Sequence, residues 1–135
     1  MAEFILKDMV HQQGRDNEFE IGSVATSNEE FGNPVYPPAK KILAEHGIGC
    51  EGHTSRQITK SDYDYYDMII AMDESNLKDL NYLLGPDKEN KISLLMEHIE
   101  NPSHLNVADP WYTRDFKTTW RDVVKGCTAL LKELK

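Results

Sequence analysis

Cysteine is scarce in this sequence, and positive charge is not in excess. The 135 residues contain two cysteines, Cys50 and Cys127, which stand far apart and form neither a CxxC pair nor a zinc-ligand spacing. The net charge is −8, which argues against non-specific binding to nucleic acid. We therefore expect buried, inert thiols, no metal site and no nucleic-acid partner.

Long apolar runs are also absent. The longest ones, such as 68–72, are far too short to cross a bilayer, and the N-terminus shows no signal-peptide pattern. We therefore predict a cytoplasmic protein with no membrane partner. Hydrophobic residues make up 39% of the sequence and charged residues 28%, which suits one globular domain with a real core.

Hydrophobic spacing predicts helices and strands that alternate along the chain. The predicted helices cover 1–13, a segment from Pro37 or Pro38 to His46, 74–84 and 116–134, with a short one capped by Thr59 and Asp62. The predicted strands cover 18–25, 66–72 and 92–96, and the last two are apolar without alternation. This order predicts an α/β domain whose parallel sheet is flanked by helices.

One short stretch combines an acid, a rigid turn and two aromatic rings. In Asp109-Pro110-Trp111-Tyr112, the proline restricts the backbone of Asp109 and so holds its carboxylate in a defined direction. Such an acid suits the protonation of a leaving group, beside rings that hold a flat substrate. Taken alone, the same four residues also fit an ordinary turn that leads into a core.

Several segments together resemble the low-molecular-weight protein tyrosine phosphatase family. They are MAEF at 1–4, GNP at 32–34, HGI at 46–48, His53 with Arg56 and Gln57, YDMIIAMDESNL at 66–77, and DPWY at 109–112. The resemblance covers essentially all 135 residues. It implies a phosphotyrosine phosphatase I-like fold, and a hydrolase that cleaves phosphate monoesters through a phosphocysteine, without a metal or other cofactor. The implied substrates are phosphotyrosine proteins or small aryl phosphates.

The resemblance also assigns the acid and the walls of the site. Asp109 would be the general acid that protonates the phenolate as the bond to phosphorus breaks. Trp111 and Tyr112 would form one rim of the pocket for the phenyl ring, and Phe31 would belong to the opposite rim. From the residues alone, Trp111 also fits a core position.

Three further residues match supporting positions of the family. Ser23 and His53 match residues that brace the phosphate loop by hydrogen bonds, and Asp73 matches an acid near the same site. Other interpretations stay open: Ser23 at the end of a strand, His53 as an exposed loop residue, and Asp73 as a helix cap.

The family's nucleophile loop, C-x5-R-[ST], does not occur in the sequence. Cys50 and Arg56 have the right separation, but Gln57 follows the arginine, and this segment corresponds to a different loop of the family. We therefore expect a single domain, 1–135, that is N-terminally truncated, lacks the first, central strand, and is inactive as it stands. A truncated product, a pseudo-phosphatase, and a site completed by another chain remain open.

The predicted absence of the first strand affects the sheet. Loss of a central strand would expose the edges of 18–25 and 66–72, so we expect rearranged pairing or a strand-exchanged homodimer.

A non-catalytic binding protein is the main alternative function. A thioredoxin-coupled arsenate reductase is disfavoured, because no cysteine lies between residues 73 and 95.

Overall fold

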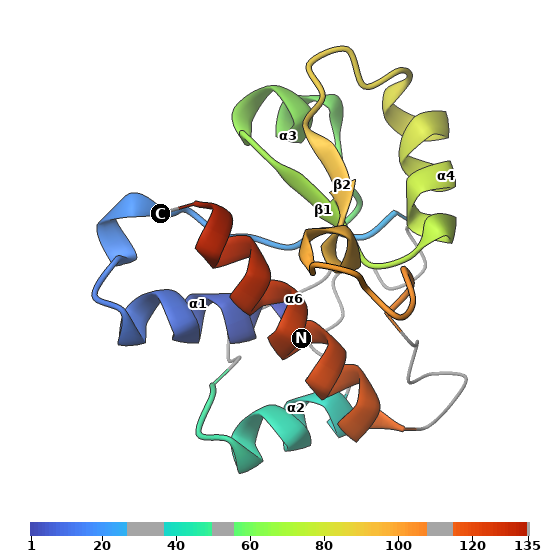
Figure 1. The fold of residues 1–135 in the computed structure, drawn as a ribbon. Helices are drawn as coiled ribbons and strands as arrows, with labels where there is room; N and C mark the ends of the chain where they lie inside the picture. The colour runs from blue at the N-terminus through green and yellow to red at the C-terminus, as the bar shows by residue number, and fades with distance from the viewer. Residues whose placement is uncertain (27–36, 50–55, 108–114, 135) are drawn as a thin grey trace.

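Two short parallel strands form the centre of the described fold. The computed structural model describes residues 1–26, 37–49, 56–107 and 115–134, and the structural statements here concern these residues. Strand β1 (Ile69–Ala71) pairs in parallel with β2 (Ile92–Leu94). Helix α4 (Glu74–Leu84) connects the strands and packs on one side of them, while α1 and α6 lie on the other (Figure 1).

Helices make up most of the remaining described chain. They are α1 (Ala2–Gln12), the 3-10 helix η1 (Asp16–Glu18), α2 (Pro37–Glu45), α3 (Lys60–Tyr65), the 3-10 helix η2 (Leu95–His98) and α6 (Phe116–Glu133). Each predicted helix is present within about two residues of its expected bounds. The small parallel sheet with flanking helices confirms the predicted α/β class.

The helix ends lie at the capping residues of the sequence. At the start of α3, the Thr59 hydroxyl accepts a hydrogen bond from the Asp62 N–H, and the Asp62 carboxylate accepts one from the Thr59 N–H at 2.8 Å. At the start of α4, the Asp73 carboxylate accepts from the Asn76 N–H at 2.8 Å. Helix α4 ends at Gly85, whose φ of 76° favours glycine. Local capping contacts therefore mark these boundaries.

The core consists of two clusters on opposite sides of the sheet. The larger one joins α1, α2, η2 and α6, and its buried members are Phe4, Ile5, Leu43, Leu95, Met96, Val107, Val123 and Cys127. The smaller one lies under α4 and contains Ile58, Ala71, Leu80 and Leu94. In β1, Ile69 and Ala71 pack with the smaller cluster and Ile70 with the larger one, as the pleat of a strand requires.

Helix α6 packs tightly against η2 at Gly126. A β-carbon placed at Gly126 would lie 2.5 Å from Cγ of Leu95, which is closer than such atoms can pack. Leu95 is 1% exposed, so its side chain is enclosed on the remaining sides. The absence of a side chain at Gly126 therefore lets the two elements meet at this distance.

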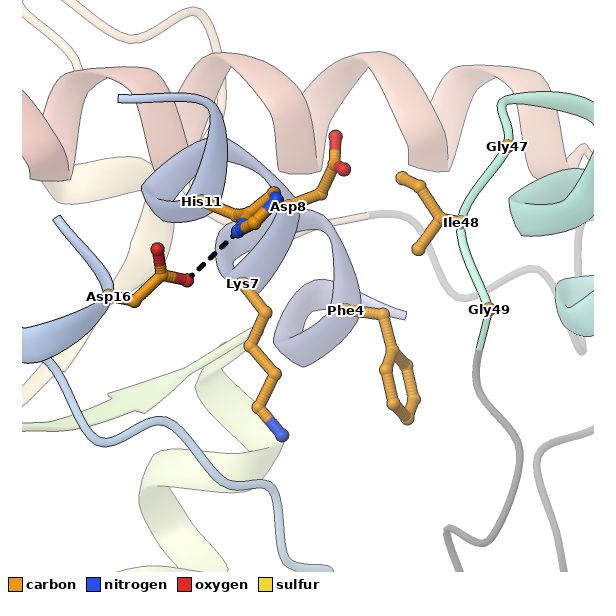
Figure 2. Close-up of a pocket in the computed structure, with 8 residues that line it drawn as sticks. All are labelled: Phe4, Lys7, Asp8, His11, Asp16, Gly47, Ile48 and Gly49. Atoms are coloured by element: carbon orange, nitrogen blue, oxygen red, sulfur yellow. Dashed lines mark hydrogen bonds and ion pairs between the residues drawn. The ribbon is translucent and has the colours of Figure 1, made fainter. Parts of the chain in front are cut away.

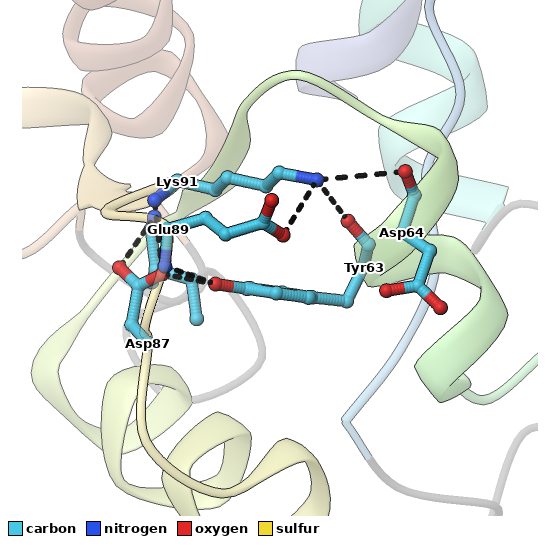
Figure 3. A network of polar contacts seen from close by, with 6 residues as sticks. Tyr63, Asp64, Asp87, Glu89 and Lys91 are labelled. Atoms are coloured by element: carbon cyan, nitrogen blue, oxygen red, sulfur yellow. Dashed lines mark hydrogen bonds and ion pairs between the residues drawn. The ribbon is translucent and has the colours of Figure 1, made fainter.

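A polar cluster joins α3 to the loop before β2 (Figure 3). The Asp87 carboxylate accepts hydrogen bonds from the Tyr63 hydroxyl at 2.6 Å and from the Lys91 and Ile92 N–H groups at 2.9 Å each. The Lys91 ammonium donates to the Tyr63 carbonyl at 2.6 Å and lies 4.9 Å from the centre of the Tyr63 ring. Burial raises the pKa of Asp87, but these hydrogen bonds outweigh it and leave the pKa lowered.

The outer edge of β2 is covered by side chains. Its alternate backbone donors, the N–H groups of Ile92 and Leu94, are bonded at 2.9 Å to carboxylates of Asp87 and Glu97 respectively. Unpaired N–H groups at a sheet edge can pair with another chain, and these two carry partners already. The edge of β2 is therefore closed to a further strand.

The predicted strand at 18–25 is wrong. Residues 16–18 form η1, and the following residues join the sheet region only through a parallel bridge between Ala25 and Gln57. Val24 is 36% exposed, whereas a central strand would bury it. A strand gains its stability from neighbouring backbone, and among the described residues this segment has only the short stretch around Gln57 beside it. Strands β1 and β2 are also shorter than predicted. After β1 the Met72 N–H donates to the Asn76 side chain, and directly after β2 the 3-10 helix η2 begins at Leu95.

Candidate functional site

The described residues include two of the seven predicted site residues, Ser23 and Asp73. The other five lie outside the described ranges: Phe31, His53, Asp109, Trp111 and Tyr112. Cys50 also lies outside them. The structure therefore describes the framework on both sides of these residues in the chain.

Asp73 stands directly after β1 and caps α4. Its carboxylate is bonded to the Asn76 N–H, and its carbonyl accepts from the Leu77 N–H at 3.3 Å. The capping interpretation of Asp73 is confirmed, and its relation to a phosphate site stays a prediction. Ligands in open parallel sheets bind beyond the carboxyl ends of the strands, which is where Asp73 lies.

The chain that leads to Asp109 is fixed at the same end of β1. The Val107 N–H donates to the Met72 carbonyl at 2.9 Å, and Val107 is 7% exposed. One residue earlier, the Asn106 side chain accepts from the Glu74 N–H at 3.0 Å, at the first turn of α4. The backbone two residues before Asp109 is therefore held at the carboxyl end of the sheet.

Two asparagines that sequence reasoning missed make this junction. Asn106 is one, and Asn76 is the other, since its side-chain oxygen accepts from the Met72 N–H at 3.2 Å. Asparagine side chains commonly bond backbone groups where regular structure ends. The signal for Asn76 was its place three residues after the helix cap, whereas no local pattern marks a partner for Asn106.

Ser23 is bonded to the first turn of α1. Its hydroxyl donates to one carboxylate oxygen of Glu3 at 2.5 Å, and the Lys7 ammonium donates to the other at 2.5 Å. Glu3 is 8% exposed, so its charge needs these partners. The spacing of Glu3 and Lys7 marks a helical ion pair in the sequence, whereas the contact with Ser23 spans 20 positions.

Arg56 is held by a carboxylate. Its two terminal nitrogens donate to the two oxygens of Asp62 at 2.8 Å each, a bidentate pair that ties residue 56 to α3. The hydrogen bonds from Arg56 lower the pKa of Asp62 to about 2. An arginine engaged in this way is not arranged as the phosphate-binding arginine of a C-x5-R loop. The interpretation of Cys50 and Arg56 as a chance match stays a prediction, because Cys50 lies outside the described residues.

Cys127 is not arranged as a nucleophile. It is 1% exposed inside α6, and burial raises the pKa of its thiol to about 12. A thiol with this pKa is protonated near neutral pH and does not attack phosphorus. Within the described ranges, no group of three acidic, histidine or cysteine side chains is placed to hold a metal ion.

A shallow pocket of about 320 Å³ lies between α1 and the turn after α2 (Figure 2). Its lining residues are Phe4, Lys7, Asp8, His11, Asp16, Gly47, Ile48 and Gly49. His11 and Asp16 contact each other across 3.2 Å, and Lys7 is already paired with Glu3. None of the seven predicted site residues lines this pocket, and its charges are largely paired within the chain.

Comparison with known proteins decides the family. The family model described as "Low molecular weight phosphotyrosine protein phosphatase" matches residues 1–135. The chain belongs to this family. The low molecular weight protein-tyrosine-phosphatase YfkJ of Bacillus subtilis is 30% identical over 135 residues, which cover all of this chain and 86% of the relative. The human low molecular weight phosphotyrosine protein phosphatase is 35% identical over 136 residues, which cover 98% of this chain and 85% of the human protein.

Solved structures of the phosphatase family have the same fold. The crystal structure of YfkJ from Bacillus subtilis superposes with a TM-score of 0.95 at 30% identity, over 98% of this chain and 84% of that one. The family member from Streptococcus pyogenes gives a TM-score of 0.86 at 36% identity, over 99% and 83% of the two chains. In the part of the phosphatase chain that the structure describes, no helix has both the length and the apolar character to cross a membrane.

Proposed function

We propose that this chain carries the acid side of a phosphotyrosine phosphatase site, with Asp109 as the general acid. The single observation that supports this most is the anchoring of Val107 to Met72 at the carboxyl end of β1. It fixes the approach of the chain to Asp109 at the end of the sheet where ligands bind in such folds. Trp111, Tyr112 and Phe31 are proposed as the rims around the aryl group.

Proton transfer is what Asp109 would contribute to the reaction. Tyrosine has a pKa of about 10, so its phenolate is a poor leaving group unless an acid protonates it as the bond to phosphorus breaks. Ser23 and His53 would brace the phosphate loop by hydrogen bonds. The contact of Ser23 with Glu3 supports this placement, because it fixes Ser23 at the amino end of α1.

The nucleophile is the part that these 135 residues do not supply. They contain no C-x5-R-[ST] pattern, Cys127 is buried, and the arginine that follows Cys50 is paired with Asp62. We therefore propose that a polypeptide limited to these residues does not hydrolyse phosphate monoesters. In that form it would be a single domain of the family.

The test is hydrolysis of p-nitrophenyl phosphate and of a phosphotyrosine peptide by the 135-residue polypeptide. The expected release of phosphate equals that of buffer, and Asp109→Asn, Cys50→Ser and Cys127→Ser leave it unchanged. Turnover that disappears in Cys50→Ser or Cys127→Ser would overturn the proposal, since either result identifies a nucleophile in the chain. Titration with orthovanadate, followed by tryptophan fluorescence, is expected to show no saturable binding.

A non-catalytic binding protein is the second candidate. The predicted aromatic rim supports it, because aromatic rings can hold a flat side chain without any nucleophile. A phosphotyrosine peptide and its unphosphorylated form would be compared by isothermal titration calorimetry. This function would be favoured over the phosphatase if both peptides bind, if binding weakens in Trp111→Ala, and if no phosphate is released.

The strand-exchanged homodimer also remains a proposal. Strand β1 pairs with β2 on one edge, and alternate strand residues direct their backbone groups to opposite edges, so Ile70 faces the edge away from β2. That edge can accept a strand from a second copy. Light scattering coupled to gel filtration at high protein concentration is expected to show a dimer. A strictly monomeric chain under these conditions would exclude it.

A further inference from the structure

Three side chains outside the predicted phosphatase site form a continuous hydrogen-bonded network. The hydroxyl oxygen of Ser93, in β2, lies 2.9 Å from Nε2 of His98, at the end of η2. Nδ1 of the same ring lies 2.9 Å from both carboxylate oxygens of Glu133, in the last turn of α6. A carboxylate only accepts hydrogen bonds, so Nδ1 carries the proton and Nε2 accepts from Ser93.

The packing of α6 on η2 holds the three residues together. Gly126 contacts Leu95 at the start of η2, and Glu133 follows two turns later on the same helix, beside His98. The His98 side chain is 10% exposed, whereas that of Glu133 is 49% exposed and Ser93 is partly exposed. The imidazole is therefore fixed between its partners, and Ser93 is only partly buried.

We propose that Ser93, His98 and Glu133 form an acyl-transfer site for small activated carboxylic esters. An activated nucleophile requires a base within hydrogen-bonding distance and a third group that orients the base, and both distances meet this requirement. The acid lies on Nδ1 and the serine on Nε2, which leaves Nε2 free to take the serine proton. Glu133 faces the positive charge that then develops on the ring.

The reaction balances with the ester and water alone. The Ser93 hydroxyl oxygen bonds to the ester carbonyl carbon while its proton passes to Nε2 of His98. The carbon–oxygen bond to the alcohol breaks, and the alcohol leaves with the proton from Nε2. Water then attacks the acyl-serine carbonyl and gives its proton to Nε2. The acid departs, and the proton returns to Ser93.

A second serine–histidine–acid contact in the chain provides the matched control. The Ser103 hydroxyl lies 2.9 Å from Nδ1 of the adjacent His104, and Nε2 of that ring lies 3.0 Å from an Asp122 oxygen. Here the serine and the acid occupy the opposite nitrogens, and the His104 side chain is 47% exposed. The ring is less fixed than that of His98, so we assign no activity to this cluster.

The test combines ester hydrolysis with covalent labelling of the 135-residue chain. Release of p-nitrophenol from p-nitrophenyl acetate is expected to fall at least about tenfold in Ser93→Ala and in His98→Gln, and to stay unchanged in Ser103→Ala and His104→Gln. Glu133→Gln, a change in a positioning residue, is expected to lower the rate and shift its pH profile. Circular dichroism checks that the variants remain folded.

Labelling of the unaltered protein gives a result that does not depend on any variant. An alkyl fluorophosphonate is expected to add one phosphonyl group to Ser93, as the oxygen–phosphorus bond forms and fluoride leaves, and peptide mass spectrometry locates the group. Hydrolysis that is unchanged in a folded Ser93→Ala variant would overturn the proposal. Labelling that is absent from Ser93, or equal on Ser93 and Ser103, would overturn it as well.

Discussion

Substitution of Gly126 by alanine tests the contact that positions η2 against α6. The new β-carbon would lie 2.5 Å from Cγ, 2.9 Å from Cδ2 and 3.1 Å from Cδ1 of Leu95. Because Leu95 is enclosed in the core, its side chain cannot move away without displacing neighbours. We therefore expect this substitution to be unfavourable, although alanine is the better helix former.

Two opposing terms determine the magnitude. Replacement of glycine by alanine inside a helix contributes about 1 kcal/mol of stability, whereas overpacking of a core costs about 1–3 kcal/mol. The net loss for Gly126→Ala is thus up to about 2 kcal/mol. In a Leu95→Ala background the obstructing atoms are gone, so the same substitution should stabilise by about 1 kcal/mol. The effect of Gly126→Ala therefore changes sign between the two backgrounds.

The assay is a double-mutant cycle measured by urea unfolding with circular dichroism. Leu95→Ala alone is expected to cost about 2–5 kcal/mol, and the coupling between the two sites about 1–3 kcal/mol. Gly49→Ala serves as a control, because a β-carbon at Gly49 meets no atom within 4 Å. If Gly126→Ala stabilises both backgrounds by the same amount, the packing argument is wrong.

Three further predictions concern groups whose contacts the structure defines. Asp62→Asn should cost about 1–2 kcal/mol near neutral pH, a value reduced for the 46% exposure of the Arg56 side chain. Since the folded pKa of Asp62 lies near 2, below its unfolded value, this stabilisation is present at neutral pH and is lost as the pH falls through about 2. A difference in unfolding free energy between the unaltered chain and Asp62→Asn that grows as the pH falls would contradict it. Tyr63→Phe should lower the urea midpoint by removing the donor to Asp87, whereas Tyr82→Phe, at an 88% exposed residue, should leave it unchanged. In a Cys50→Ser chain, Cys127 should react with a disulfide reagent only after unfolding; rapid reaction in native buffer would show that its burial is not maintained.

The sequence predicted those features that depend on neighbouring residues. Thr59 with Asp62, Asp73 before α4, and Gly85 after it mark helix ends, because capping bonds and left-handed turns involve only a few consecutive positions. The helix at 116–134 was predicted for the same reason, since helical spacing brings its apolar residues to one side. The spacing patterns therefore identified the helices and the α/β class.

Features that depend on distant partners were not predicted. The segment at 18–25 has a strand pattern, but alternation does not supply the neighbouring backbone that a strand requires. The contacts of Ser23 with Glu3 and of His98 with Glu133 join residues 20 and 35 positions apart, so no local pattern marks them. Of the site residues, Ser23 and Asp73 could be located, and the roles of all seven stay predictions.

The side chains on the outer edge of β2 limit how far the sheet can extend between molecules. Asp87 and Glu97 occupy the N–H groups of that edge, so within the described two-stranded sheet the edge at Ile70 is the one proposed to accept a partner. Two copies joined through their Ile70 edges would present only closed edges on both outer sides. Association through the sheet would therefore stop at a pair and would not propagate into a fibre.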